Sequence, residues 1–260
     1  MTLIANARMY SVAPAAAAAW RALLERVSRD AGVALDFMDY PAPQPLDVLW
    51  ARDDLGCVQM CGYPYAMAQP RPALIATPVP MRFGAPVYAT DFVVRADSPF
   101  QSLEDTFGYR IGWTVQHSQS GFNAARHHLL RYRSADRPRL YAQSLGNLVT
   151  ARAIVQAVLD GRIDVGPLDA WWHELLKLHE PATAARLRTV ATTATVPAPP
   201  FVAAPGTDPG IVAALRRALL ALPPQPALAL QGYAELPPDA YGVTAAWARE
   251  AVAAGYPEPA

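Results

Sequence analysis

The stretch that decides the fold is YRIGW at residues 109–113 followed by HSQSGFN at residues 117–123. The first segment has the composition of a buried strand, and Phe122, Ala125 and Leu129 then recur with helical spacing. A turn of small hydroxyl residues and glycine between a strand and a helix presents backbone amides that have no acceptor within the helix. Such amides, together with the helix dipole, attract anions. The stretch therefore predicts an α/β unit with an anion-holding turn.

The same turn also has a purely structural interpretation. Ser118 or Ser120 can accept hydrogen bonds from amides one turn further on and so cap their own helix. No nucleophile, base or metal-ligand set accompanies the turn, so it indicates binding and not catalysis. The residues of the turn alone leave both interpretations open.

The composition is that of a folded protein without attraction for polyanions. Hydrophobic residues make up 52% of the 260 residues and charged residues 17%, which is typical of a globular chain. Lysine plus arginine and aspartate plus glutamate both number 22, so the formal net charge is zero. Nucleic-acid and anionic-membrane partners usually require a basic excess. We therefore expect no nucleic-acid partner, and the lack of a long apolar run predicts no membrane insertion.

The N-terminal residues MTLIAN do not form the basic region and apolar core of a secretory leader. Two interpretations stay open. Either the protein is cytoplasmic, or the sequence begins after a leader has been removed.

Cysteine and histidine spacing argues against a metal or redox site. Cys57 and Cys61 would lie on one face of a strand at 55–60, roughly 13 Å apart and too far for a disulfide bond. On a helix, the spacing of His173 and His179 turns them about 120° from each other. No carboxylate pair and no serine–histidine–carboxylate set has a suitable spacing. We expect no metal, no cofactor and no catalytic residue.

Alternating strand and helix patterns predict an α/β fold in which each lobe is a mostly parallel sheet flanked by helices. We expect helices that start at Pro14 and Pro209 and helices capped by Asn147 and Asp169. Strands are expected at residues 2–6, 33–38, 55–60, 139–141 and 162–166.

Two long extended segments, at residues 87–95 and 187–203, bracket the middle of the chain. They predict a discontinuous lobe one, residues 1–88 and 200–260, and a lobe two, residues 89–199. The extended segments would be the two hinge strands that join the lobes.

Aromatic side chains follow several of the expected strands. In an open α/β sheet, ligands bind beyond the carboxyl ends of the strands, and tyrosine and tryptophan can both stack and donate hydrogen bonds there. Each aromatic residue alone is better explained by packing in the core or at its rim, whereas the acidic residue of the set is equally well explained by a helix N-cap and by a ligand contact. The set consists of Tyr10, Tyr63, Tyr65, Tyr88, Asp169 and Trp171.

Three stretches resemble one known family. They are YATDFVVR at 88–95 with DSP at 97–99 and LED at 103–105, the turn at 117–123, and VLDGRIDVG at 158–166. Together they are similar to the phosphate/phosphonate-type substrate-binding components of ABC transporters, which have a two-lobed periplasmic-binding-protein type II fold. The resemblance covers most of the chain. The turn departs from the family, because HSQS stands where a Ser-Thr-Ser-Gly-type run is usual.

The resemblance implies a function and a site. Ser118, Ser120 and Gly121 match the turn that grips the phosphonate, Tyr88 matches an aromatic residue of the cleft, and Asp169 and Trp171 lie where the second lobe contributes contacts. The protein would be a periplasmic monomer that closes by a hinge around a small anionic ligand, of phosphonate or phosphate-ester type, for the permease of an ABC transporter. Combined with the aromatic set above, this predicts that the amides of Ser120 and Gly121 hold the anionic group, while the rest of the ligand is lined by Tyr10, Tyr63, Tyr65, Tyr88 and Trp171.

One alternative of another class stays open. Proteins of the same fold include cytoplasmic enzymes or sensors, which are chorismate-dehydratase-like or related to thiamine-pyrimidine synthesis. The missing leader favours them, whereas the missing acid–base pair and cysteine-rich motif disfavour them.

Overall fold

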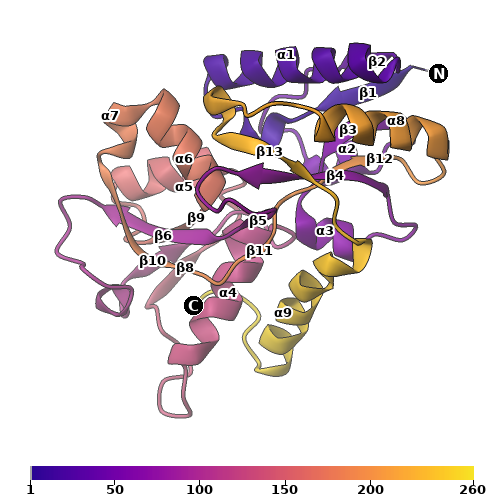
Figure 1. Cartoon of the computed structure of the whole chain (residues 1–260). Coiled ribbons are helices and arrows are strands. Elements are labelled where there is room, and N and C mark those ends of the chain that lie inside the picture. The colour runs from indigo at the N-terminus through magenta and orange to yellow at the C-terminus, as the bar shows by residue number, and fades with distance from the viewer. Residues whose placement is uncertain (1) are drawn as a thin grey trace. The chain divides into compact units, whose positions relative to one another are not determined.

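Two units, each with its own sheets, make up the computed structural model, which describes residues 2–260 (Figure 1). Unit 1 contains the residues up to Val87 together with Pro197–Tyr241. Unit 2 contains Tyr88–Val196 and Gly242–Ala260. The chain therefore passes from one unit to the other three times.

The sheet of unit 1 has six strands in the order β13-β4-β12-β3-β1-β2. One half is parallel, because β1 (Leu3–Asn6) pairs with β2 (Leu35–Phe37) and β3 (Leu55–Gln59) in the same direction. Every residue of β3 is buried, as expected for a parallel strand covered on both faces.

Antiparallel pairs complete this sheet. Strand β12 (Phe201–Ala203) lies between β3 and β4 (Ala73–Pro80), and β13 (Leu230–Ala234) pairs with β4 at the edge. Residues 201–203 follow the second crossing of the chain, so this returning segment is built into the middle of the first sheet.

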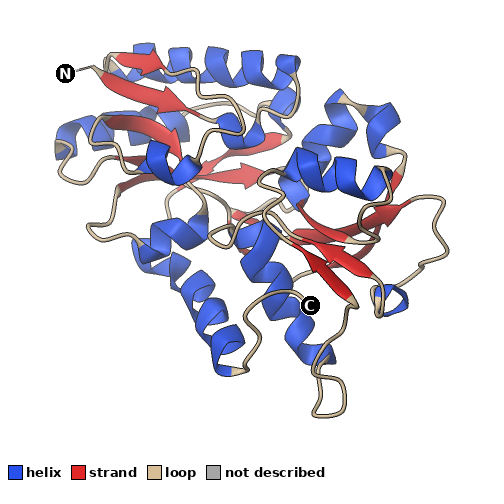
Figure 2. Ribbon diagram, turned by 180° about the vertical axis from the view of Figure 1, so that it is seen from behind, coloured by secondary structure: helices blue, strands red, loops and turns tan. Residues whose placement is uncertain are grey.

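Local sequence signals explain where the helices of unit 1 begin and end. Helix α1 (Pro14–Ala31) starts with proline and ends at Gly32, whose φ of 64° places it in the left-handed region that favours glycine. Helix α8 (Pro209–Leu220) is capped by Asp208, which accepts hydrogen bonds from two amides of the first turn. Helices α1 and α8 contact each other. The short helices α2 (Leu46–Trp50) and α3 (Gly62–Met67) complete the α-helices of this unit and are labelled in Figure 1. Figure 2 distinguishes the helices, strands and loops by colour from the opposite side.

Unit 2 is built around β6 (Thr90–Arg95), which pairs antiparallel with β9 (Gly166–Asp169) and β10 (Leu187–Thr192). A second, parallel pair joins β7 (Arg110–Gly112) and β8 (Gln143–Leu145). The helical segments of this unit are η3 (Gln119–Asn123), α4 (Ala124–Leu129), α5 (Ala151–Leu159), α6 (Ala170–His179), α7 (Pro181–Ala184) and α9 (Gly242–Ala253).

The α/β class expected from the sequence is confirmed, and so are the helices that start at Pro14 and Pro209 and the one capped by Asp169. Three expected details are wrong. Helix α5 is capped by Thr150, which accepts from the Ala153 amide, and not by Asn147. Instead of a strand at 162–166 the ladder beside β6 begins at Gly166, and β8 lies at 143–145 instead of at 139–141.

The end of the chain differs from the expected division into lobes. Residues 200–260 were all expected in lobe one, whereas α9 belongs to unit 2 and contacts α4. Asn123 donates to the carbonyl of Thr244, His127 pairs with Glu250, and Arg126 donates to the carbonyl of Pro257. These contacts tie α9 and the residues after it to unit 2.

Within residues 2–260, no helix combines the length and the apolar character that crossing a membrane requires.

Candidate functional site

The turn between β7 and α4 has the geometry of an N-cap. Ser118 has an extended backbone, and its hydroxyl accepts a hydrogen bond of 3.0 Å from the Gly121 amide. The Asn123 amide donates to the Ser118 carbonyl at 3.0 Å, five residues back, so the first turn is a wide π-type turn. Ser118 is therefore the N-cap, as the structural interpretation of the turn expects, and the Gly121 amide already donates its hydrogen bond to Ser118.

The remaining groups of the first turn are those of Gln119 and Ser120. Amides in the first positions of a helix have no intrahelical acceptor, and Ser120 is half-buried with a small hydroxyl side chain. These features favour the Ser120 amide and hydroxyl, instead of the Gly121 amide, as the groups that would meet an anion.

Gly121 is required by close packing. A Cβ atom added at this position would lie 2.1 Å from the Thr114 hydroxyl oxygen and 2.8 Å from the Thr114 methyl carbon. The Thr114 amide also donates to the Gly121 carbonyl at 3.1 Å. Glycine therefore lets the turn approach the segment after β7, which a larger residue would prevent.

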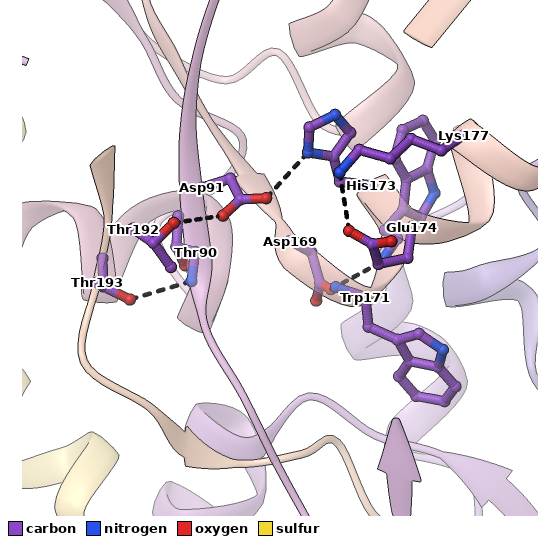
Figure 3. A network of polar contacts seen from close by, with 10 residues as sticks. Thr90, Asp91, Asp169, Trp171, His173, Glu174, Lys177, Thr192 and Thr193 are labelled. Atoms are coloured by element: carbon purple, nitrogen blue, oxygen red, sulfur yellow. Dashed lines mark hydrogen bonds and ion pairs between the residues drawn. The ribbon is translucent and has the colours of Figure 1, made fainter. Parts of the chain in front are cut away.

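Thr90, which was not among the site residues expected from the sequence, connects the turn to the central strand of unit 2. Its hydroxyl donates to the Ser120 carbonyl at 3.0 Å. Its amide donates to the Thr193 hydroxyl at 3.0 Å, as Figure 3 shows. The signal was present in YATDFVVR, where two polar residues interrupt an otherwise apolar strand. Both are buried in the structure.

Asp169 lies beside Thr90 in the register between β6 and β9. Its Oδ1 accepts hydrogen bonds from the amides of Trp171 and Trp172 at 2.9 and 3.0 Å, which makes it the N-cap of α6. Figure 3 shows Asp169 beside Trp171 at the start of this helix. The Trp171 side chain is fully buried. The structure thus brings Ser120, Thr90 and Asp169 into one hydrogen-bonded region of unit 2.

The other expected site residues are placed as follows. Tyr88 is buried in β5 (Val87–Tyr88), at the first crossing of the chain. In unit 1, Tyr10 is buried and its carbonyl accepts from the Trp20 indole at 3.2 Å. Tyr63 is half-buried on α3.

Tyr65, also on α3, packs edge-on against the ring of Tyr241 at 4.9 Å. It belongs to the hydrophobic core of unit 1, and burial raises the pKa of its hydroxyl. Its hydroxyl oxygen is buried and has no hydrogen-bond partner among residues 2–260. A buried hydroxyl without a hydrogen-bond partner destabilises the folded protein. A ligand could supply the missing partner, so the Tyr65 hydroxyl is compatible with a ligand contact although the ring packs in the core.

The described part of the chain has neither a cluster of metal ligands nor a cysteine placed to act as a nucleophile. No group of three or more histidine, cysteine, aspartate and glutamate residues there could hold a metal ion. Cys57 is buried on β3, and burial strongly raises the pKa of its thiol, so a thiolate is disfavoured. Cys61 is not on the strand but at the N-cap position of α3, and neither cysteine forms a disulfide bond within residues 2–260.

Comparison with known proteins gives a family match over most of the chain. The family model described as "ABC transporter, phosphonate, periplasmic substrate-binding protein" matches residues 11–238. No curated protein matches the sequence.

Two solved structures share the fold across nearly all of the chain. The binding protein component of an ABC phosphonate transporter from Pseudomonas aeruginosa superposes with a TM-score of 0.80 at 17% identity, covering 98% of this chain and 87% of its own. PhnD1 from Prochlorococcus marinus, in complex with methylphosphonate, has a TM-score of 0.79 at 15% identity, with coverages of 96% and 97%.

A Xanthomonas citri protein bound to ATP has a TM-score of 0.62 at 21% identity and covers 98% of both chains. At these identities the likeness establishes the fold, which is that of type II periplasmic binding proteins.

Proposed function

Because the chain belongs to the family of periplasmic substrate-binding proteins of phosphonate ABC transporters, we propose that it binds a small anion of the phosphonate or phosphate-ester class. The match of the family model over residues 11–238 carries this proposal. The methylphosphonate held by PhnD1 supports the ligand class. Delivery of the ligand to an ABC permease, and a location in the periplasm, are parts of the same proposal.

In unit 2, the proposed anion site centres on the first turn of η3. The Ser120 amide and hydroxyl would donate to the phosphonate oxygens, and the positive end of the helix dipole would add to the attraction. Thr90 holds the Ser120 carbonyl at 3.0 Å and Ser118 caps the Gly121 amide, so the turn is already shaped without a ligand. A preshaped site loses less conformational freedom on binding.

The remaining candidates are proposed as the walls for the organic part of the ligand. Tyr65 has a buried hydroxyl that lacks a partner within residues 2–260, and Tyr63, two residues earlier on α3, is half-buried. Tyr10, Tyr88 and Trp171 are buried, so contact with a ligand requires local exposure of their ring edges. Hinge closure and a monomeric state stay predictions from the family.

Calorimetric titration with methylphosphonate, aminoalkyl phosphonates and phosphate esters tests the proposal, and Ser120→Asp is the decisive variant. A carboxylate in the first turn favours the helix through its dipole, so the protein should remain folded. The same carboxylate would occupy the place of the anion and repel it, so we expect binding to fall at least about 100-fold.

Ser120→Asn is the matched control, because it has the same shape without the charge. We expect it to bind more tightly than Ser120→Asp by about 10-fold or more. Equal affinities of wild type and Ser120→Asp would remove the turn from the site. Failure of the wild type to bind any of these anions would overturn the proposed ligand class.

A further inference from the structure

A buried polar network adjoins Thr90, and none of its residues belongs to the proposed anion site. It consists of Asp91, His173 and Thr192. Nδ1 of His173 on α6 lies 2.9 Å from Oδ2 of Asp91 on β6, and the two side chains are 3% and 0% exposed. The hydroxyl of Thr192 on β10 donates to the other carboxylate oxygen of Asp91 at 2.7 Å. Figure 3 shows these three side chains pointing toward one another from different elements.

The network fastens the elements that carry the site. Asp91 follows Thr90, whose hydroxyl holds the Ser120 carbonyl. His173 lies one turn after Asp169, which caps α6 and is paired in register with Thr90. The Asp91–His173 bond is thus a direct side-chain link between β6 and the first turns of α6, formed within four residues of Asp169.

Stabilisation of the core is a weak explanation for the buried Asp91–His173 pair. Removing two polar or charged groups from water is costly, and well-packed apolar residues of similar volume often stabilise a core as well or better. A hydrogen-bonded pair, however, fixes distance and orientation, which apolar contacts do less sharply. Lys177 and Glu174 form a contrasting pair on the same helix, where the side chains are 47% and 29% exposed and the expected contribution is small.

We propose that His173 is a positioning residue for the anion site. Through Asp91 it holds the start of α6 against β6 and thereby sets the places of Asp169 and Thr90, and with Thr90 that of the Ser120 turn. This inference rests on the proposed function, since the site that it positions is the proposed anion site.

Three variants separate positioning from stability. His173→Leu removes the hydrogen bond and keeps an apolar side chain of moderate size. His173→Asn restores a donor, because the asparagine amide nitrogen occupies a place similar to that of Nδ1. Lys177→Gln breaks the exposed pair on the same helix and serves as the matched control.

The measurement is calorimetric titration of each folded variant with methylphosphonate, combined with its thermal midpoint. We expect His173→Leu to weaken binding about 10-fold, His173→Asn to recover most of this loss, and Lys177→Gln to bind like the wild type. If His173→Leu does not fold, Thr192→Val replaces it, because valine removes the hydroxyl that holds Asp91 at nearly constant volume.

The proposal would be overturned if His173→Leu had a lower thermal midpoint but bound methylphosphonate as tightly as the wild type. The histidine would then only stabilise the core. Native-state hydrogen exchange gives a test that needs no ligand. The amides of Trp171 and Trp172 should exchange faster in His173→Leu and recover in His173→Asn, and unchanged exchange would equally overturn the positioning role. Should the wild type bind no phosphonate, the proposed function fails, while the exchange data still decide whether His173 fixes α6.

Discussion

His128 on α4 is a titratable residue that the structure places in an apolar environment. Its side chain is buried, its ring lies 5.4 Å from that of Phe92, and neither ring nitrogen has a hydrogen-bond partner among residues 2–260. Burial, followed by the positive charges of Arg131 and His127, lowers its pKa to about 4. At neutral pH the imidazole is therefore uncharged in the folded protein.

The pH dependence of unfolding tests this. Between pH 6.5, the ordinary value, and pH 4 the unfolded chain binds a proton at His128 that the folded protein does not. The free energy of unfolding should therefore fall with falling pH across this window, by up to about 3 kcal/mol from this residue. We expect His128→Leu to lose that part of the dependence in urea unfolding at a series of pH values. If the free energy of unfolding of wild type and His128→Leu changed with pH in parallel, the assignment of this pH dependence to His128 would be wrong, because all other groups titrate in both proteins.

At the scale of single residues, local chemistry was predictable and contacts were not. Pro14, Asp169 and Pro209 act at helix ends, where their roles depend on the adjacent backbone, and the sequence identifies all three. Thr90 and the Asp91–His173 pair depend on which strands and helices meet, and spacing along the chain does not contain that information. Whether Ser118, Ser120 and Gly121 contact a ligand stays a prediction.

At the scale of elements, α6 and α8 start in the same way and offer an internal comparison. Asp169 and Asp208 each accept hydrogen bonds from two amides of the first turn of their helix. Asp169 is a proposed site residue, whereas Asp208 lies in unit 1 in front of Pro209 and is not.

Replacing each aspartate by alanine should lower the free energy of unfolding by about 1 kcal/mol, since each helix loses its cap. We expect only Asp169→Ala to weaken binding of the ligand found for the wild type. Asp169→Asn keeps a capping oxygen and shows how much of the loss belongs to the charge. Equal affinities of Asp169→Ala and Asp208→Ala would leave Asp169 as a cap without a binding role, as judged by calorimetry and urea unfolding.

Elements with strong periodicity or clear caps were predictable, and short elements were not. Strand β4 contains Pro78 and Pro80, which argue against a strand in sequence terms because proline lacks the amide donor. It forms because β12 and β13 flank it on both sides. Helices α2 and α3 have five and six residues, too few to show a helical period.

At the scale of the whole molecule, the lobes expected from the sequence and the units seen in the structure differ in where they place α9. Tyr256 and Ala260 are buried in the hydrophobic core of unit 2, and Leu140 donates its amide to the Ala260 carbonyl. We therefore place residues 242–260 with unit 2, in contrast to the division expected from the sequence, which follows the two long crossing strands alone.

Removing residues 242–260 tests this division. Unit 2 would lose α9 and the residues that cover α4, whereas unit 1 would keep every strand of its sheet. We expect hydrogen exchange, read by mass spectrometry, to accelerate around Phe92 and Ile111 and to stay slow around Val58 and Leu74. Loss of protection in unit 1 instead would support the division in which α9 belongs to lobe one.

The three passages between the units have a consequence for biosynthesis. On the ribosome, the strands β1 to β4 emerge early but lack β12, which fills the middle of their sheet and is made only after residues 88–196. The second unit in turn lacks α9 until the last residues emerge. Neither unit has its last segment before most of the other unit has been synthesised, so we expect both to complete folding late, with long-range contacts limiting the rate. During that interval the edges of β3 and β4 that later pair with β12 expose unpaired amide and carbonyl groups, and the chain then depends most on a chaperone to prevent aggregation.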